Sequence, residues 1–185
     1  LDVSDLSYIT DAGLEYLAAM PLRILDVSNC LDITDAGFAH LAGKPLHTLR
    51  MSGMFDITDG ALVHLSGLPL QTLDLSDCWR INDAGLANLN GVPLQSLSLS
   101  SCDHITNVGL THLVGMPLQR LNLGWCDRVT DEGLAHLATL PLQERSLLGN
   151  QSITDAGLVH LTVLPRQSLD LSDCWRINDA GLANL

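Results

Sequence analysis

The stretch PLQTLDLSDCWRINDAGLANL, residues 69–89, contains the pattern that decides the fold of the whole chain. Leu73 and Leu75 alternate with polar residues, as in a short strand that turns one side inward. Leu86 and Leu89 are three residues apart, as on one face of a helix. The segment therefore predicts one short strand followed by one short helix.

This pattern recurs along all 185 residues. The seven prolines are spaced by 24 residues: Pro21, Pro45, Pro69, Pro93, Pro117, Pro141 and Pro165. Because proline fixes its own backbone and lacks an N–H group, each one marks the same point in a repeated unit. We predict a single domain, residues 1–185, of about seven and a half units. Both ends fall inside a unit, so we expect a piece of a longer solenoid.

Polar residues mark the start of each predicted helix. The residue before the apolar helical run is a good N-cap residue in every unit: Thr34, Thr58, Asn82, Thr106, Thr130, Thr154 and Asn178. The residue after the cap is acidic, with one exception, and would face the positive end of the helix dipole: Asp11, Asp35, Asp59, Asp83, Asn107, Asp131, Asp155 and Asp179. Glycines such as Gly37 and Gly85, two positions later, are expected to let adjacent helices approach.

The second unit shows the spacing that carries a family resemblance: Leu22, Leu25, Val27, Cys30, Ile33, Thr34 and Asp35. It resembles the leucine-rich repeat, and more closely its cysteine-containing subclass, whose consensus is L-x-x-L-x-L-x-x-C-x-x-I-T-D-x-G-L. The resemblance covers residues 1–185. It implies an α/β horseshoe solenoid, with a parallel sheet on the concave face and helices on the convex face.

Composition narrows the classes of partner. The net charge is −12, whereas phosphate binding relies on clustered lysine and arginine, so neither nucleic acid nor an anionic membrane is expected as a partner. No uncharged apolar run reaches the roughly 18 to 20 residues that span a bilayer. Hydrophobic residues make up 46% of the chain but aromatic residues only 4%, which fits a core filled by leucine, isoleucine and alanine.

All five cysteines occupy one register, just after the predicted strand: Cys30, Cys78, Cys102, Cys126 and Cys174. By the resemblance, this position turns inward, where a small thiol can pack and make weak hydrogen bonds to turn backbone. Buried structural thiols are therefore favoured over disulfides or a metal site. A stack of free thiols indicates the cytoplasm or another reducing compartment.

Five histidines also share a register, on the predicted helices: His40, His64, His112, His136 and His160. Neighbouring helices lie roughly 8 to 10 Å apart, whereas one zinc ion needs all its ligands at about 2 Å, so no metal site is expected. Serine, histidine and aspartate residues that could form a catalytic triad are copies of repeated positions, as a structural role predicts. The sequence therefore predicts neither an enzyme nor a cofactor.

Function is expected where the units differ, at outward positions in and after the strands and just beyond the cysteine. Exposed aromatic residues beside charged ones supply much of the energy of protein interfaces. The predicted partner-binding residues are Arg50, Asp74, Asp77, Trp79, Ser98, Arg120, Asn122, Trp125, Asp170 and Trp175. Arg50, Asp74, Ser98, Asn122 and Asp170 are expected at strand centres. For Trp79 and Trp175, packing against their own loops stays open as the alternative.

The leading functional prediction is a non-enzymatic module that binds a protein partner on its concave face. By resemblance, two more specific roles follow: the substrate-receptor part of a ubiquitin ligase, or a bacterial effector that engages host proteins. A structural alternative is end-to-end self-association, because an uncapped solenoid can form contacts that do not close.

Two features depart from a regular repeat. Residues 73–89 and 169–185 are identical, which indicates recent copying of units or deliberate construction. Arg145 and Arg166 occupy registers that other units fill with leucine. A charge forced into a core costs several kcal/mol unless it reaches water, so the sixth and seventh units are predicted to be the least stable.

Overall fold

One parallel sheet runs through the whole molecule, which a computed structural model describes at residues 1–161 and 168–185. The strands follow chain order, β1 to β7, and pair in register by whole units, so that Leu73 lies between Leu49 and Leu97. Their bounds are β1 Ile24–Asp26, β2 Thr48–Arg50, β3 Thr72–Asp74, β4 Ser96–Ser98, β5 Arg120–Asn122, β6 Glu144–Ser146 and β7 Ser168–Asp170. Pro165 and Arg166 lie outside the described residues.

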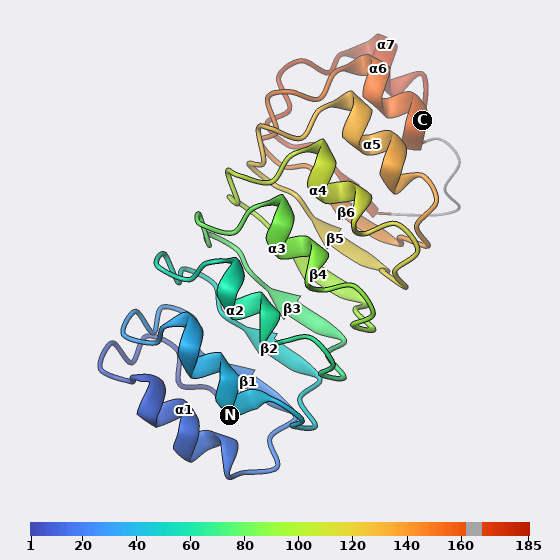
Figure 1. Ribbon diagram of the computed structural model, residues 1–185. Helices are drawn as coiled ribbons and strands as arrows, with labels where there is room; N and C mark the ends of the chain where they lie inside the picture. Colours follow the sequence, from blue (N-terminus) through green and yellow to red (C-terminus); the bar gives the residue numbers. More distant parts are fainter. Residues whose placement is uncertain (162–167) are drawn as a thin grey trace.

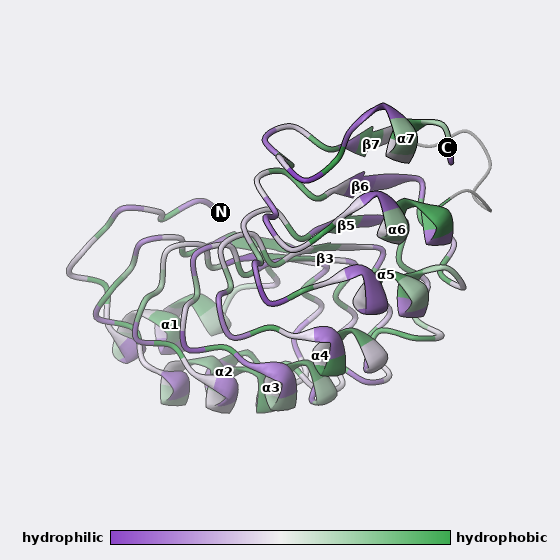
Figure 2. Ribbon diagram, turned by 90° about the horizontal axis from the view of Figure 1, so that it is seen from above, coloured by the Kyte–Doolittle hydropathy of each residue, from purple (hydrophilic) through white to green (hydrophobic). Residues whose placement is uncertain are grey.

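Short helices alternate with the strands. Their bounds are α1 Asp11–Ala18, η1 Asp35–Leu41, α2 Asp59–Val63, α3 Asp83–Ala87, α4 Asn107–Thr111, α5 Asp131–Leu137, α6 Asp155–Leu158, η2 Val159–Leu161 and α7 Asp179–Leu182. The helices stack beside one another along the array (Figure 1). Seen from above, the array bends, with helices on its outer side and strands on its inner side (Figure 2). The predicted α/β repeat solenoid is confirmed.

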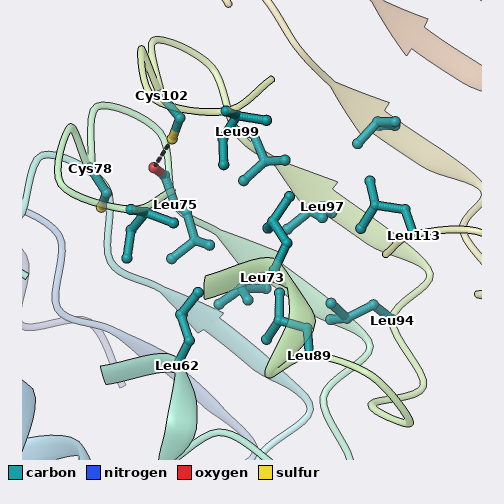
Figure 3. Close-up of a cluster of buried hydrophobic side chains, with 14 of the residues drawn as sticks. Leu62, Leu73, Leu75, Cys78, Leu89, Leu94, Leu97, Leu99, Cys102 and Leu113 are labelled. Atoms are coloured by element: carbon teal, nitrogen blue, oxygen red, sulfur yellow. Dashed lines mark hydrogen bonds between the residues drawn. The ribbon is translucent and has the colours of Figure 1, made fainter. Parts of the chain in front are cut away.

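The core lies between the sheet and the helix row. Leu73 and Leu75 from one strand region belong to the same buried core cluster as Leu89, which lies just after α3. Figure 3 also shows their equivalents one unit further along, Leu97, Leu99 and Leu113. Burying a leucine side chain contributes roughly 1.5 to 3 kcal/mol, so the stack as a whole stabilises each unit through its neighbours. None of the described helices is long and apolar enough to cross a membrane.

The cysteine thiols connect consecutive units. The Cys102 thiol donates a hydrogen bond of 3.1 Å to the Leu75 carbonyl of the preceding unit (Figure 3). The other four do the same: Cys30 to Val3, Cys78 to Met51, Cys126 to Leu99 and Cys174 to Leu147. All five are free and buried, so the predicted inward packing is confirmed. Burial raises the pKa of the Cys78 and Cys126 thiols to about 12.

We expect the five thiols to resist labelling in the folded protein. Only the thiolate reacts, and a pKa of about 12 leaves Cys78 and Cys126 almost entirely protonated at neutral pH. Titration with a thiol reagent should therefore modify few cysteines in buffer and all five in denaturant. Rapid labelling of the native protein, or a disulfide detected in its mass, would contradict this expectation.

The aspartates that follow the helix caps form a ladder of hydrogen bonds between units, which the sequence did not reveal. The Asp83 carboxylate accepts from the Thr106 backbone N–H at 2.8 Å and from the Thr106 hydroxyl at 2.6 Å. The Thr106 hydroxyl in turn accepts from the Val108 N–H, which caps α4. The predicted helix cap and the preceding unit are thus parts of one network.

Asn107 replaces aspartate in this ladder and changes the next cap. Its side-chain oxygen accepts from the Thr130 N–H at 2.9 Å, and its Nδ2 donates to the Thr130 hydroxyl at 2.8 Å. The Thr130 side chain makes no cap hydrogen bond to α5, so the predicted side-chain cap is wrong there, and Thr10 before α1 also makes none. The reason is that the Thr130 hydroxyl oxygen accepts from Asn107 Nδ2. The Thr106 hydroxyl instead donates to a carboxylate, and its oxygen accepts from the helix N–H.

The helix glycines allow the ladder to form. A Cβ atom added to Gly109 would overlap Oδ1 of Asp83 in the preceding unit. The same overlap with an aspartate occurs at Gly37, Gly85, Gly157 and Gly181. The expected close approach of adjacent helices is confirmed, and the group that needs the space is a carboxylate.

Arg145 enters the core instead of reaching water. Its exposed fraction is 5%, and it lies in register between Leu121 and Leu169. Nη2 makes one long hydrogen bond of 3.4 Å, to the Leu137 carbonyl on α5. Nε has no partner among the described residues. The predicted burial of this charge is confirmed, at the point where the sixth unit meets its neighbours.

Candidate functional site

Outward-facing side chains of the strands cover the inner face of the sheet. In β3, Leu73 is buried whereas Thr72 and Asp74 on either side are partly exposed. This pattern repeats from strand to strand and produces two rows of outward residues. The first row consists of the first residue of each strand, and the second row of the last residue. The predicted row of Arg50, Asp74, Ser98, Asn122 and Asp170 forms the second, but it lies at the last residue of each strand. The prediction of strand centres is wrong by one position, because each strand is only three residues long.

A pocket of about 340 Å³ lies on this face, over β4 to β7. Its outward polar lining comes from both rows: Ser96, Ser98, Arg120, Asn122, Glu144, Ser146, Ser168 and Asp170. The structure therefore brings together four predicted residues: Ser98, Arg120, Asn122 and Asp170. Glu144 was not among them, although its place in the first row, beside Arg120, was visible in the repeat.

Local hydrogen bonds hold the Asp170 carboxylate of the pocket in place. Asp170 Oδ1 accepts from the Ser172 N–H at 3.0 Å, and the Ser172 and Ser146 side chains also bond to it. These bonds, led by those from Ser172, lower the pKa of the Asp170 carboxyl, which therefore stays ionised at neutral pH. Arg120 Nε makes only a long bond of 3.4 Å to Ser96 Oγ. A guanidinium and a carboxylate thus face the pocket, both suited to bind polar groups of a ligand.

Arg50 and Asp74 continue the same row toward the N-terminus, beyond the residues that line the pocket. Arg50 Nη1 forms a loose ion pair of 3.8 Å with Asp26 Oδ2, and Arg50 is about half exposed. Asp74 Oδ1 accepts from the backbone and the hydroxyl of Ser76, at 3.0 and 2.6 Å. Both side chains are ordered by their neighbours while keeping part of their surface in water.

Trp125 has a strained backbone in the turn after β5. Its φ is 58°, in the left-handed region, which costs a non-glycine residue about 1 to 2 kcal/mol. Every equivalent turn has the same conformation, held by Asp5, Asn29, Gly53, Asp77, Ser101, Gly149 and Asp173, most of which are residue types that tolerate it better than tryptophan. The indole lies over Gly149, where an added Cβ would come within 2.6 Å of three ring atoms. Yet 44% of Trp125 remains exposed.

The remaining predicted residues lie in the loops after the strands. Trp79 stacks on Phe55 of the preceding unit, with ring centroids 4.7 Å apart and planes at 28°. Trp175 is 80% exposed, and Gln151 takes the place of the phenylalanine beside it. Trp79 therefore packs on a neighbouring loop and not its own. Asp77 occupies a left-handed turn, with φ of 60°. The structure does not bring these three into the pocket.

The five histidines of one register lie on or directly after the helices, on the outer side of the array. His64 and His112 are the C-cap residues of α2 and α4, and both are partly exposed. Within residues 1–161 and 168–185, no three histidine, cysteine, aspartate or glutamate side chains cluster as metal ligands would.

Comparison with known proteins finds a matching family model and similar structures. A family model described as "Leucine Rich repeat" matches residues 69–89, 93–114, 116–138 and 167–185. A chain in the crystal structure of the Rad7 and Elc1 complex in yeast is 25% identical, with a TM-score of 0.68 over 79% of this chain and 41% of that one.

A chain in the crystal structure of the TLR13–ssRNA13 complex is 22% identical, with a TM-score of 0.63 over 96% of this chain and 26% of that one. At this identity, the likeness concerns the fold alone. The chain spans less than half the length of either structure. No curated protein matches the sequence.

Proposed function

Because the chain is a leucine-rich repeat protein, we propose that it is a non-enzymatic module that binds a protein partner on the concave face of its sheet. The pocket over β4 to β7 is the observation that carries the proposal. It gathers a guanidinium, two acidic side chains, an amide and hydroxyl groups on one open surface. Such a mixture suits the varied polar groups of a protein surface better than it suits one small substrate.

Trp125 supports the same proposal. It lies three residues beyond Asn122, which lines the pocket, and its exposed indole is kept at a cost in backbone strain. Tryptophan is also among the residues that contribute most to binding when an interface covers them.

The charge of the chain favours protein over nucleic acid as the partner. The net charge of −12 would repel phosphate groups, and the pocket contributes one outward-facing arginine against two acidic residues. The similar chain in the Rad7 and Elc1 complex also comes from an assembly of two proteins. Both observations agree with a protein partner.

Alanine variants of Arg120, Asn122 and Trp125 are expected to weaken binding of the partner, by roughly tenfold for Trp125. Partners would be identified by pull-down and mass spectrometry, and affinities measured by calorimetry after circular dichroism confirms folding. His64→Ala and His112→Ala provide the control, because these side chains lie on the outer, helical side. If the histidine variants lost affinity and the strand variants kept it, the helical face would be the binding surface.

A further inference from the structure

An exposed apolar ladder follows the loops beside the concave face. It consists of Leu31, Phe55 and Trp79, which hold equivalent positions in three consecutive units and are 47, 39 and 50% exposed. The 4.7 Å between the Phe55 and Trp79 rings matches the spacing of adjacent strands, roughly 4.8 Å, so the unit spacing persists into these loops. Phe55 covers one face of the Trp79 ring, and half of Trp79 remains exposed.

The next unit places a carboxylate at the equivalent position. Asp103 follows Trp79 in the same register and is exposed. Within residues 1–161 and 168–185, no cation is paired with it. The nearby arginine, Arg80, is engaged with Asp56 at 3.2 Å. A half-exposed indole and an unpaired carboxylate therefore hold equivalent positions in two adjacent units, in a protein of net charge −12.

We propose that the open face of Trp79 binds an arginine side chain of the protein partner, with the guanidinium stacked on the indole and paired with the Asp103 carboxylate. The inference rests on the proposed function, to which it adds a second contact and its chemistry. Arginine fits because its planar guanidinium stacks on aromatic rings and pairs with carboxylates through two parallel N–H groups. Lysine can supply the charge but neither the plane nor the fork.

The chain contains its own control in Trp175. Residues 169–185 repeat residues 73–89 without a change, so the two tryptophans have identical flanking sequences. Trp175, however, has Gln151 where Trp79 has Phe55, so it lacks the aromatic neighbour. Any general attraction between an acidic protein and a basic peptide would affect both tryptophans, whereas the indole stacked on a phenylalanine is that of Trp79.

The test is an NMR titration of the three indole N–H signals, assigned with single Trp→Phe variants. The probe is a short capped peptide of alternating glycine and arginine, compared with its lysine and citrulline counterparts. We expect the arginine peptide to shift the Trp79 signal most, the lysine peptide less, and the neutral citrulline peptide hardly at all. Asp103→Asn should lower the affinity of the arginine peptide by roughly threefold to fivefold. Trp175→Phe should leave the shift of the Trp79 signal unchanged.

Equal shifts at Trp79 and Trp175, equal shifts with citrulline, or an unchanged affinity in Asp103→Asn would each overturn the proposal. Arg120→Ala separates it from the proposed function, because Arg120 lines the pocket and not the ladder. If that variant bound the partner normally while the Trp79 response persisted, the concave-face proposal would fail and the arginine site would stand. If the arginine peptide left Trp79 unshifted, the arginine site would fail whatever the concave variants showed.

Discussion

Replacing Arg145 by leucine should stabilise the protein by about 2 to 4 kcal/mol. The guanidinium is 5% exposed and makes one long hydrogen bond, and its Nε has no partner in the described part of the chain. Leucine fills this register in the neighbouring strands, at Leu121 and Leu169. The variant removes an unpaired buried charge and restores an apolar contact, so it should raise the midpoint of urea unfolding at pH 7.

The pH dependence of this penalty follows from the pKa of Arg145. Burial lowers that pKa to about 10, below the usual range of arginine, so the folded state binds the proton more weakly than the unfolded state does. The destabilisation is therefore fully present below pH 10 and is relieved only as the pH rises above that value. At neutral pH, the comparison of wild type and variant should report the whole penalty.

Arg120→Leu is the matched control, since Arg120 begins the adjacent strand β5 but faces outward and is exposed. Its replacement should change the free energy of unfolding by no more than about 0.5 kcal/mol. A wild-type or lower midpoint for Arg145→Leu would show that the buried guanidinium makes favourable contacts which outweigh its desolvation.

The fold could be predicted because its rules repeat within each unit. The spacing of Leu73, Leu75, Leu86 and Leu89 fixes which side of each strand and helix is buried. The shared register of the cysteines was visible in the sequence, and their inward position followed from the resemblance to the leucine-rich repeat. Periodicity is a property of the chain alone, and the parallel stacking follows from it.

Contacts between units were harder to predict, because they depend on which side chains become neighbours after stacking. The sequence analysis interpreted Asp83 as a partner for its own helix dipole. Its hydrogen bonds to Thr106 form only when two units stack side by side. Trp79 and Trp175 have the same flanking sequence, yet among the described residues Trp79 alone of the two has an aromatic neighbour. The strain at Trp125 and the pocket over β4 to β7 likewise arise from the assembled turns and strands.

The second large effect is expected at the ladder between units: Asp83→Ala should destabilise the protein by roughly 2 to 4 kcal/mol. The variant removes the acceptor of two hydrogen bonds, from the Thr106 N–H and the Thr106 hydroxyl. Both donors are partly buried at the junction of two units, so losing the acceptor also loosens the start of α4. Urea unfolding monitored by circular dichroism measures the change.

Asp83→Asn separates hydrogen bonding from charge, because the chain already contains this arrangement one unit further along. Asn107 accepts from the Thr130 N–H and donates to its hydroxyl, so an amide can hold the junction without a carboxylate. The asparagine variant should therefore recover most of the stability that Asp83→Ala loses, at the cost of the Thr106 cap on α4. If asparagine were as damaging as alanine, the negative charge beside the helix N-terminus would be the stabilising element, and the ladder would be secondary.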